Sequence, residues 1–209
     1  MTAKQILQDF LPPIVVRSAT RLRSITGRQH IETCSAGGQD QPDSDDHNHP
    51  ERLVVLPFLS GAVLEIGCGH RKTLDSAIAV DLTPGGEAGV WGNVAGMISA
   101  ADAAADGSCL PFKSQSFDTL VARHNLEHYV DIIGVLREWH RVLRKGGQLV
   151  VVVPDEQRFP GRTLDLDPTH YHAFTETSLW KLVEVTSFSP VESKPVIHGW
   201  SFMLRADRA

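Results

Sequence analysis

Residues 63–69 read VLEIGCG and residues 77–81 read AIAVD, and these two stretches decide the fold. Each begins as a short apolar run, the pattern of a buried strand, and ends in glycines or in a carboxylate. Glycine has no Cβ, so Gly67 and Gly69 let the backbone turn sharply and pass close to a ligand. Asp81, at the tip of the second run, is placed to accept hydrogen bonds from two ribose hydroxyls. The two stretches therefore indicate a nucleotide-like cofactor in a doubly wound α/β fold.

Apolar runs and helical patterns alternate along the rest of the chain, which predicts a mostly parallel sheet covered on both faces. A helix is expected over residues 129–143, where apolar side chains recur three and four apart, ended by the Gly146-Gly147 pair. A second helix is expected to run to residue 185 with Thr175 as its N-cap. Two extended segments about a tight turn near His198 are expected at the end of the chain. The predicted strands are residues 63–66, 77–80, about 102–105, 117–122 and 148–153.

The connection between the first two strands is unusually short. Only the residues GCGHRKTLDS separate them, whereas a crossover through a helix needs about a dozen residues or more. We therefore expect a compact loop or a single turn there, with Arg71 and Lys72 near the site. The loop also lacks the third glycine of the usual dinucleotide fingerprint.

Composition predicts one globular domain with a modest extension. The chain has 209 residues, of which 42% are hydrophobic, enough for one sizeable core. A net charge of -5 makes DNA and RNA poor candidate partners, because nucleic-acid binders usually carry a basic face. Cys34, Cys68 and Cys109 are odd in number and lack metal-ligand spacing, which favours a reducing cytoplasm. No apolar run approaches the roughly 18 residues that cross a bilayer, so no integral membrane segment is expected.

The first 49 residues are predicted to lie outside the main domain, which spans residues 50–209. Residues 1–31 form a basic amphipathic stretch, interpreted as a helical extension that is solvated on one side. Contact with an anionic membrane surface or with the cofactor cleft is the alternative. Residues 32–49 are acidic, contain no Lys or Arg, and predict a flexible linker. A short helix with Pro50 in its first turn should then lead into the first strand.

Three further motifs extend the pattern towards the C-terminus. Asp106 begins DGSCLPF, Ser116 begins SFDTLVARHNLEHY and Arg141 begins RVLRKGGQLVVVVPD. In this order, and after the GCG turn, they resemble class I S-adenosylmethionine-dependent methyltransferases, in particular the group with LPF, SFD, LEH and RVLxxGG signatures. The resemblance runs from about Leu53 to the C-terminus. It implies a Rossmann-like sheet with an antiparallel C-terminal strand, S-adenosyl-L-methionine as cofactor and S-adenosyl-L-homocysteine as product.

The resemblance also implies which residues of the first loop hold the cofactor. Gly67, Cys68 and Gly69 would pass beside its methionine portion and its ribose. Glu65 would orient this loop or meet the cofactor's amino group through water. The alternative for Glu65 is a purely structural role, in which its carboxylate caps backbone amides of the loop.

Further along the chain, the resemblance places the ribose and adenine contacts. Asp81 would hold the ribose diol, and Leu82 would pack on the face of the adenine. Asp106 would accept the adenine amino group, while the amide of Gly107 meets a ring nitrogen. Asp102 is the rival of Asp106, and only the spacing to LPF favours the latter.

The HNLEH motif, residues 124–128, is expected at the carboxyl edge of the fourth strand, where open α/β sheets bind ligands. His124 and Asn125 would meet the methionine end of the cofactor. Residues 167–175, DPTHYHAFT, would form part of a lid over the acceptor, or alternatively a buried loop in which Asp167 bonds His170. A metal centre built from histidines of these segments has no HExxH spacing to support it, and no metal site is predicted.

The resemblance implies transfer of a methyl group to an oxygen or nitrogen of a small molecule, a sugar or a glycan. The reaction is an in-line displacement, which needs alignment and, for some acceptors, a base. A catalytically inactive cofactor-binding module is the alternative, favoured by the shortened loop, and an NAD-dependent oxidoreductase is a weaker one. The oligomeric state is not predicted. The candidate bases are His124, His128, His170 or its neighbour His172, and Asp155.

Overall fold

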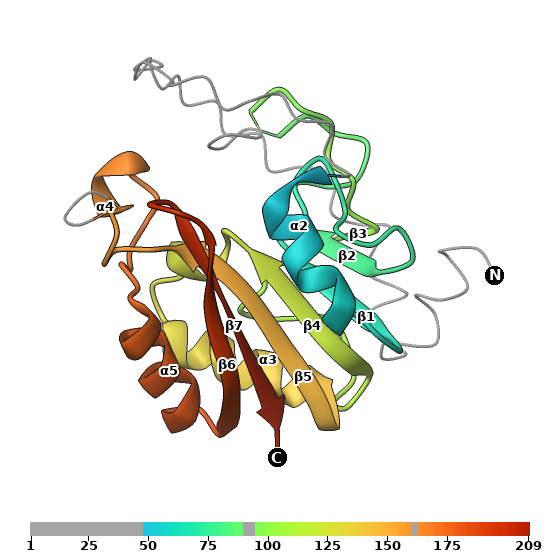
Figure 1. Cartoon of the computed structure of the whole chain (residues 1–209). Coiled ribbons are helices and arrows are strands. Elements are labelled where there is room, and N and C mark those ends of the chain that lie inside the picture. The colour runs from blue at the N-terminus through green and yellow to red at the C-terminus, as the bar shows by residue number, and fades with distance from the viewer. Residues whose placement is uncertain (1–47, 90–94, 160–162) are drawn as a thin grey trace.

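Seven strands form one twisted sheet at the centre of the molecule in the order β3-β2-β1-β4-β5-β7-β6 (Figure 1). The computed structural model describes residues 48–89, 95–159 and 163–209. Strands β1 to β5 pair in parallel, whereas β7 runs antiparallel to both of its neighbours. This confirms the predicted mostly parallel sheet with an antiparallel C-terminal strand. The strands are β1 (Val63–Ile66), β2 (Ile78–Asp81), β3 (Ala103–Ala104), β4 (Phe117–Arg123), β5 (Leu143–Pro154), β6 (Phe188–Ile197) and β7 (Ser201–Arg208).

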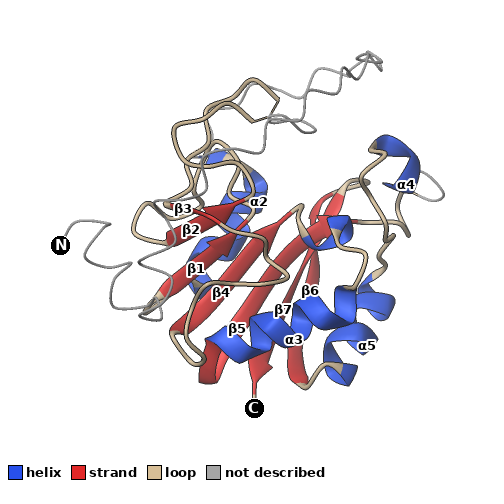
Figure 2. Ribbon diagram, turned by 180° about the vertical axis from the view of Figure 1, so that it is seen from behind, coloured by secondary structure: helices blue, strands red, loops and turns tan. Residues whose placement is uncertain are grey.

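Helices cover both faces of the sheet, as a doubly wound fold requires. Helices α3 and α5 lie on one face and α2 lies on the other, as the two opposite views show (Figures 1 and 2). The helical elements of the described residues are α2 (Pro50–Val55), η3 (Leu56–Phe58), η5 (Leu126–His128), α3 (Ile132–Val142), α4 (Thr163–Leu166) and α5 (Glu176–Val185).

Alternating side chains of the strands build a separate apolar layer on each face. Leu64 and Ile66 of β1 belong to the larger cluster under α3 and α5, together with Val151 of β5. Val63 and Val152 point the other way and pack with residues of α2 and η3. Because strands buried on both faces need apolar side chains at every position, these segments read as continuous apolar runs in the sequence.

The short connection between β1 and β2 is confirmed, since residues 67–77 form turns and no helix. Two interactions hold it against the sheet. Glu65 of β1 accepts hydrogen bonds from the Thr73 amide at 2.7 Å and from the Thr73 hydroxyl at 2.6 Å. The Lys72 ammonium lies 2.6 Å from the Asp102 carboxylate. Side-chain anchors thus replace the packing that a crossover helix would provide.

Two predicted boundaries need correction. The helix expected over residues 129–143 begins only at Ile132, because the Asp131 side chain accepts a hydrogen bond from the Gly134 amide and caps it. It ends at Val142, since Leu143 is already extended and pairs with Phe117 of β4. The Gly146-Gly147 pair therefore lies inside the long strand β5 and does not end the helix. The predictions of Thr175 as N-cap and of Pro50 in a first helical turn are confirmed.

The predicted N-terminal extension, residues 1–31, and most of the predicted linker, residues 32–49, lie outside the described part of the chain. Residue His49 is described, and it is the N-cap residue of α2. Among the described residues, no helix is both long enough and apolar enough to span a membrane.

Candidate active site

The loops after β1 and β2 meet at the carboxyl edge of the sheet. Gly67 and Gly69 adopt φ angles of 69° and 56°, in the left-handed region that glycine enters without steric cost. The Gly69 amide donates to one oxygen of Asp81 at 2.9 Å, and the Thr83 amide donates to the other at 3.0 Å. Each carboxylate oxygen accepts more than one hydrogen bond, so Asp81 keeps acceptor capacity for a ligand's hydroxyls.

Tyr129 is a central residue of this site that the sequence reasoning did not single out. Its hydroxyl donates to Asn125 Oδ1 at 2.9 Å. A Cβ on Gly107 would lie 2.1 Å from that hydroxyl, and a Cβ on Gly67 would lie 2.2 Å from Asn125 Nδ2. Burial, with a further contribution from the Asp106 charge, raises the pKa of Tyr129, so the phenol remains a donor. Gly107 and Asn125, which were predicted separately, thus meet at one hydroxyl, and Gly67 packs against Asn125.

The two candidate adenine carboxylates have different surroundings. Asp102 is engaged, because it bonds the Ala79 amide at 2.9 Å as well as Lys72. Asp106 is exposed, and among the hydrogen bonds of the described residues its carboxylate accepts only that of the nearby Ser108 amide, at 2.8 Å. The Leu82 side chain, next to Asp81, is 65% exposed, which gives the same edge an uncovered apolar surface. These surroundings favour Asp106 over Asp102 as the carboxylate that is available to a ligand.

Glu65 and Cys68 shape the loop from beneath. Glu65 is 2% exposed, and its burial raises its pKa while the charge of Arg123, 4.0 Å away, opposes that rise. Its two bonds to Thr73 agree with the structural alternative considered for this carboxylate. Burial raises the pKa of the Cys68 thiol to about 12, so it stays protonated and packs with Ala79 and Ala101.

His124 is held between two carboxylates. Its φ is 47°, which turns the chain out of β4, and its Nε2 lies 2.9 Å from Glu51 while its Nδ1 lies 3.5 Å from Glu127. Burial alone would lower the pKa of His124, but the Glu51 charge outweighs it and the pKa rises to about 10. The ring is therefore an imidazolium at neutral pH. This argues against His124 as a proton acceptor, because the hypothesis rested on an unperturbed imidazole.

A second group of side chains lies beside the first, at the end of β4. Candidate ligand atoms of Glu127, His128 and His170 all lie within 4.8 Å of one another. The rings of His128 and His170 meet edge to face with centroids 4.7 Å apart. The alternative bond between Asp167 and His170 is not formed, because Asp167 bonds Thr169 and His170 Nδ1 lies 2.6 Å from the Thr163 carbonyl. The fold thus brings the HNLEH motif and the DPTHYHAFT segment together.

The two remaining candidate bases are engaged elsewhere. Asp155 is fully buried, accepts a hydrogen bond from the Gln157 amide at 3.0 Å and pairs with the Arg158 guanidinium. It therefore caps the turn that follows β5. The His172 ring stacks on Phe174 with centroids 6.1 Å apart.

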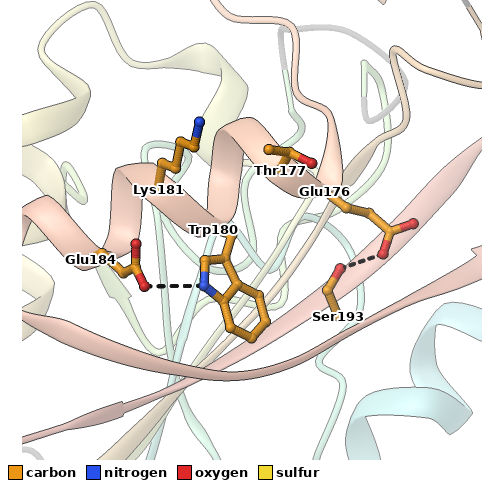
Figure 3. Close-up of a pocket in the computed structure, with 6 residues that line it drawn as sticks. All are labelled: Glu176, Thr177, Trp180, Lys181, Glu184 and Ser193. Carbon is orange, nitrogen blue, oxygen red and sulfur yellow. Dashed lines mark hydrogen bonds between the residues drawn. The ribbon is translucent and has the colours of Figure 1, made fainter.

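A hollow of about 440 Å³ lies between α5 and β6, away from these groups (Figure 3). In it, Trp180 Nε1 donates to Glu184 at 3.2 Å and the Ser193 hydroxyl donates to Glu176 at 2.8 Å. No residue predicted to bind the cofactor or the acceptor lines this hollow. The predicted site lies instead at the carboxyl edge of β1, β2 and β4. The hollow is lined by Glu176, Thr177, Trp180, Lys181, Glu184 and Ser193.

Comparison with known proteins agrees with this geometry. Residues 64–151 match the model of a methyltransferase domain family. A probable S-adenosylmethionine-dependent methyltransferase of Mycolicibacterium smegmatis is 34% identical over 91 residues, which cover 43% of this chain and 35% of that protein. A probable S-adenosylmethionine-dependent methyltransferase of Mycobacterium tuberculosis is 31% identical over 204 residues, covering 90% of this chain and 69% of the relative. The match to the first relative thus spans about a third of its length.

Solved structures share the fold. A possible histamine N-methyltransferase of Thermotoga maritima has a TM-score of 0.61 at 19% identity, covering 78% of this chain and 89% of the other. The 1,6-didemethyltoxoflavin-N1-methyltransferase of Burkholderia thailandensis, solved with its substrate and S-adenosylhomocysteine, has a TM-score of 0.58 at 23% identity, covering 80% of each chain. Together with the match that runs through 90% of the chain, these findings place the protein in the family of S-adenosylmethionine-dependent methyltransferases.

Proposed function

We propose that this protein transfers a methyl group from S-adenosylmethionine to an oxygen or nitrogen of a small molecule, with sugars and glycans among the candidate acceptors. One observation carries the proposal. Gly67 and Gly107, predicted from separate motifs, pack against Asn125 and Tyr129, which are hydrogen-bonded to each other. The same segment carries Glu127 and His128, which form a cluster of titratable side chains with His170. We infer from this arrangement that the nucleoside of the cofactor binds beside the acceptor.

The residues present suit this cofactor. Asp81 retains acceptor capacity for ribose hydroxyls, and the exposed Leu82 beside it offers an apolar face for adenine. A side chain at Gly67 or Gly107 would clash with Asn125 or Tyr129, so both positions require glycine. When bound, S-adenosylmethionine supplies an electrophilic methyl group on a sulfonium sulfur. The loop after β1 needs no third glycine for such a ligand, because the cofactor has no pyrophosphate to cradle.

The protein's contribution is to align the acceptor and, where the acceptor is a hydroxyl, to receive its proton. His128 and His170 each use Nδ1 to contact loop atoms, which leaves Nε2 of each ring for the acceptor. His124, charged by its carboxylate neighbours, instead holds the end of β4 in place. We therefore assign the acceptor side to the cluster of His128, His170 and Glu127.

Two relatives by fold support a small-molecule acceptor. The Burkholderia thailandensis enzyme acts on 1,6-didemethyltoxoflavin, and the Thermotoga maritima protein is a possible histamine methyltransferase. The net charge of -5 also argues against a nucleic-acid acceptor. The reducing cytoplasm suggested by the cysteines is the proposed place of action.

Calorimetric titration of the full chain with S-adenosylmethionine, S-adenosylhomocysteine and NADH tests the cofactor assignment. We expect micromolar binding of the two sulfur compounds and none of NADH. Replacing Asp81→Ala should weaken that binding by about 1.5–3 kcal/mol, because hydrogen bonds to a charged group are lost. Asp75→Ala is the matched control, since it removes an exposed carboxylate from the same connection.

Failure of the unmodified chain to bind either sulfur compound would refute the proposal. Equal affinity of the Asp81→Ala and Asp75→Ala variants would refute the role of Asp81. Binding followed by no methyl transfer to a panel of sugars, phenols and amines would favour the alternative of an inactive cofactor-binding module.

A further inference from the structure

We propose that Glu127, His128 and His170 bind a divalent transition-metal ion on the acceptor side of the site. The three side chains offer two imidazole nitrogens and a carboxylate oxygen within 4.8 Å of one another. No spacing in the sequence predicts this site, because His170 reaches the LEH motif only through the fold. The first argument for an ion comes from Glu127.

The Glu127 carboxylate is buried without the hydrogen bonds that burial normally requires. Glu127 is 0% exposed, and neither of its carboxylate oxygens has a hydrogen-bond partner among the described residues. The His124 Nδ1 atom lies 3.5 Å from Oε1, close enough for an ion pair but not for a hydrogen bond of good geometry. A buried carboxylate is costly unless a cation or several donors compensate it. The His124 imidazolium offsets part of this charge from the side of Oε1. A metal ion between Glu127 and the two imidazoles would give the carboxylate the close partner that it lacks among the described residues.

The surroundings of the two histidines are those of metal ligands. A ligating histidine usually donates its other ring N–H to a carbonyl or another fixed acceptor. His170 Nδ1 lies 2.6 Å from the Thr163 carbonyl, and His128 Nδ1 lies 2.9 Å from the Thr169 hydroxyl. That hydroxyl donates in turn to Asp167 at 2.6 Å, so it accepts from the His128 ring. Both contacts place the N–H on Nδ1 and leave the Nε2 lone pair for an ion.

The distances also suit a shared ion. Two imidazoles at the usual metal–nitrogen distance of about 2.0–2.1 Å place their ring centroids about 5 Å apart. The rings of His128 and His170 have centroids 4.7 Å apart. Atoms that bind one ion at about 2.0–2.2 Å lie closer together than 4.8 Å, so the side chains must rotate toward one another to coordinate it. Two imidazoles and one carboxylate suit Zn²⁺, Mn²⁺ or Fe²⁺ and leave coordination positions open.

The open positions indicate the class of acceptor, an extension that rests on the proposed function. A bound ion would take oxygen atoms of the acceptor and lower the pKa of a coordinated hydroxyl, whose proton then leaves to water. Two neighbouring oxygens fill two open positions, so the acceptor expected here carries a vicinal diol, as many sugars do. In this arrangement His128 and His170 bind the ion through Nε2, and the coordinated ion replaces them in promoting loss of the acceptor's proton.

Titration of the EDTA-treated full chain with Zn²⁺ and, separately, with Mn²⁺ tests the site by calorimetry. We expect one strongly bound ion per chain. Glu127→Gln and His170→Asn should each raise its dissociation constant at least about tenfold, since even indirect partners of a metal site contribute that much. His198→Asn, which removes an exposed imidazole from the turn between β6 and β7, should leave it unchanged. With Mn²⁺ bound, a diol-containing sugar should reduce the enhancement of water-proton relaxation by displacing coordinated water.

Absence of a bound ion, or equal affinity in all three variants and the unmodified chain, would overturn the metal site. Circular dichroism and titration with S-adenosylmethionine in the same samples show whether each variant is folded. If Glu127→Gln does not fold, His170→Asn decides, because residue 170 lies in a surface loop. A bound ion with no effect of the sugar would overturn only the acceptor class. Failure of the unmodified chain to bind the cofactor would overturn the proposed function and the acceptor class that rests on it, but not the metal site.

Discussion

Residue 67 must be a glycine for two separate reasons. Its φ of 69° is unfavourable for other residues, and a Cβ would lie 2.2 Å from Asn125 Nδ2. Asn125 cannot simply swing away, because its Oδ1 accepts the hydrogen bond from Tyr129. A methyl group at residue 67 would therefore disturb the contacts that surround the proposed cofactor.

The Gly67→Ala variant tests this close approach. We expect it to lower the free energy of unfolding by about 1–3 kcal/mol more than Gly146→Ala does, because overpacking usually costs that much. We also expect it to weaken cofactor binding. Gly146 has a nearly equal φ of 73° but open space around it, so it reports the backbone cost alone. Urea denaturation measures the difference. Equal losses in the two variants would show that contact with Asn125 is unimportant.

Helix α5 begins with a complete capping box. The Thr175 side chain accepts from the Ser178 amide at 3.1 Å, and the Ser178 hydroxyl accepts from the Thr175 amide at 2.9 Å. This reciprocal pair satisfies two amides that a helix N-terminus leaves free. The cap also marks where the DPTHYHAFT segment ends and the helix under the sheet begins.

Replacing Thr175→Ala should lower the free energy of unfolding by about 1 kcal/mol, the usual loss for a removed N-cap. Thr177→Ala serves as control, because residue 177 is exposed in the first turn of the same helix and makes no cap contact. Thermal unfolding of the two variants side by side gives the comparison. A loss of similar size in both would mean that the cap contributes nothing specific.

Across the whole molecule, an ion pair and a hydrogen bond of Glu51 join three distant parts of the chain. Glu51 of α2 lies 2.9 Å from His124, which follows β4, and also accepts a hydrogen bond from Ser201 of β7. Burial would raise the pKa of Glu51, but the His124 charge prevails and lowers it to about 2. The same interaction raises the pKa of His124 to about 10. Helix α2 is thereby fastened to the edge of the sheet where the site lies.

The ion pair predicts how stability depends on pH. The folded chain holds the His124 proton more tightly than the unfolded chain does, so this contribution is complete below about pH 6.5 and is lost as the pH rises towards 10. The Glu51 contribution is complete above about pH 4.5 and is lost as the pH falls towards 2. Urea denaturation at several pH values should show a decline above neutral pH that Glu51→Gln reduces, while Glu127 maintains the remainder.

Glu87→Gln is the control for this series, because Glu87 is an exposed carboxylate. It should keep the pH profile of the unmodified chain. A Glu51→Gln profile that still declines as steeply between neutral pH and pH 10 would show that His124 is not the group responsible.

The sequence by itself determined the elements and their class, because strand and helix periodicity, caps and glycine turns are local properties. VLEIGCG, AIAVD and the short loop between them predicted the parallel pair β1 and β2 without a crossover helix, and Thr175 predicted the start of α5. The end of α3 was predicted wrongly, because pairing of Leu143 with β4 prevails over the local glycine signal.

Only the tertiary structure decided the properties that depend on neighbours distant in the sequence. The Tyr129 hydroxyl contacts Asn125 and lies against Gly107. His124 is charged because the carboxylate of Glu51, 73 residues away, raises its pKa. The cluster of Glu127, His128 and His170 exists because the DPTHYHAFT segment folds back on the end of β4. Burial and electrostatic interactions act through space, and no local pattern of residues records them.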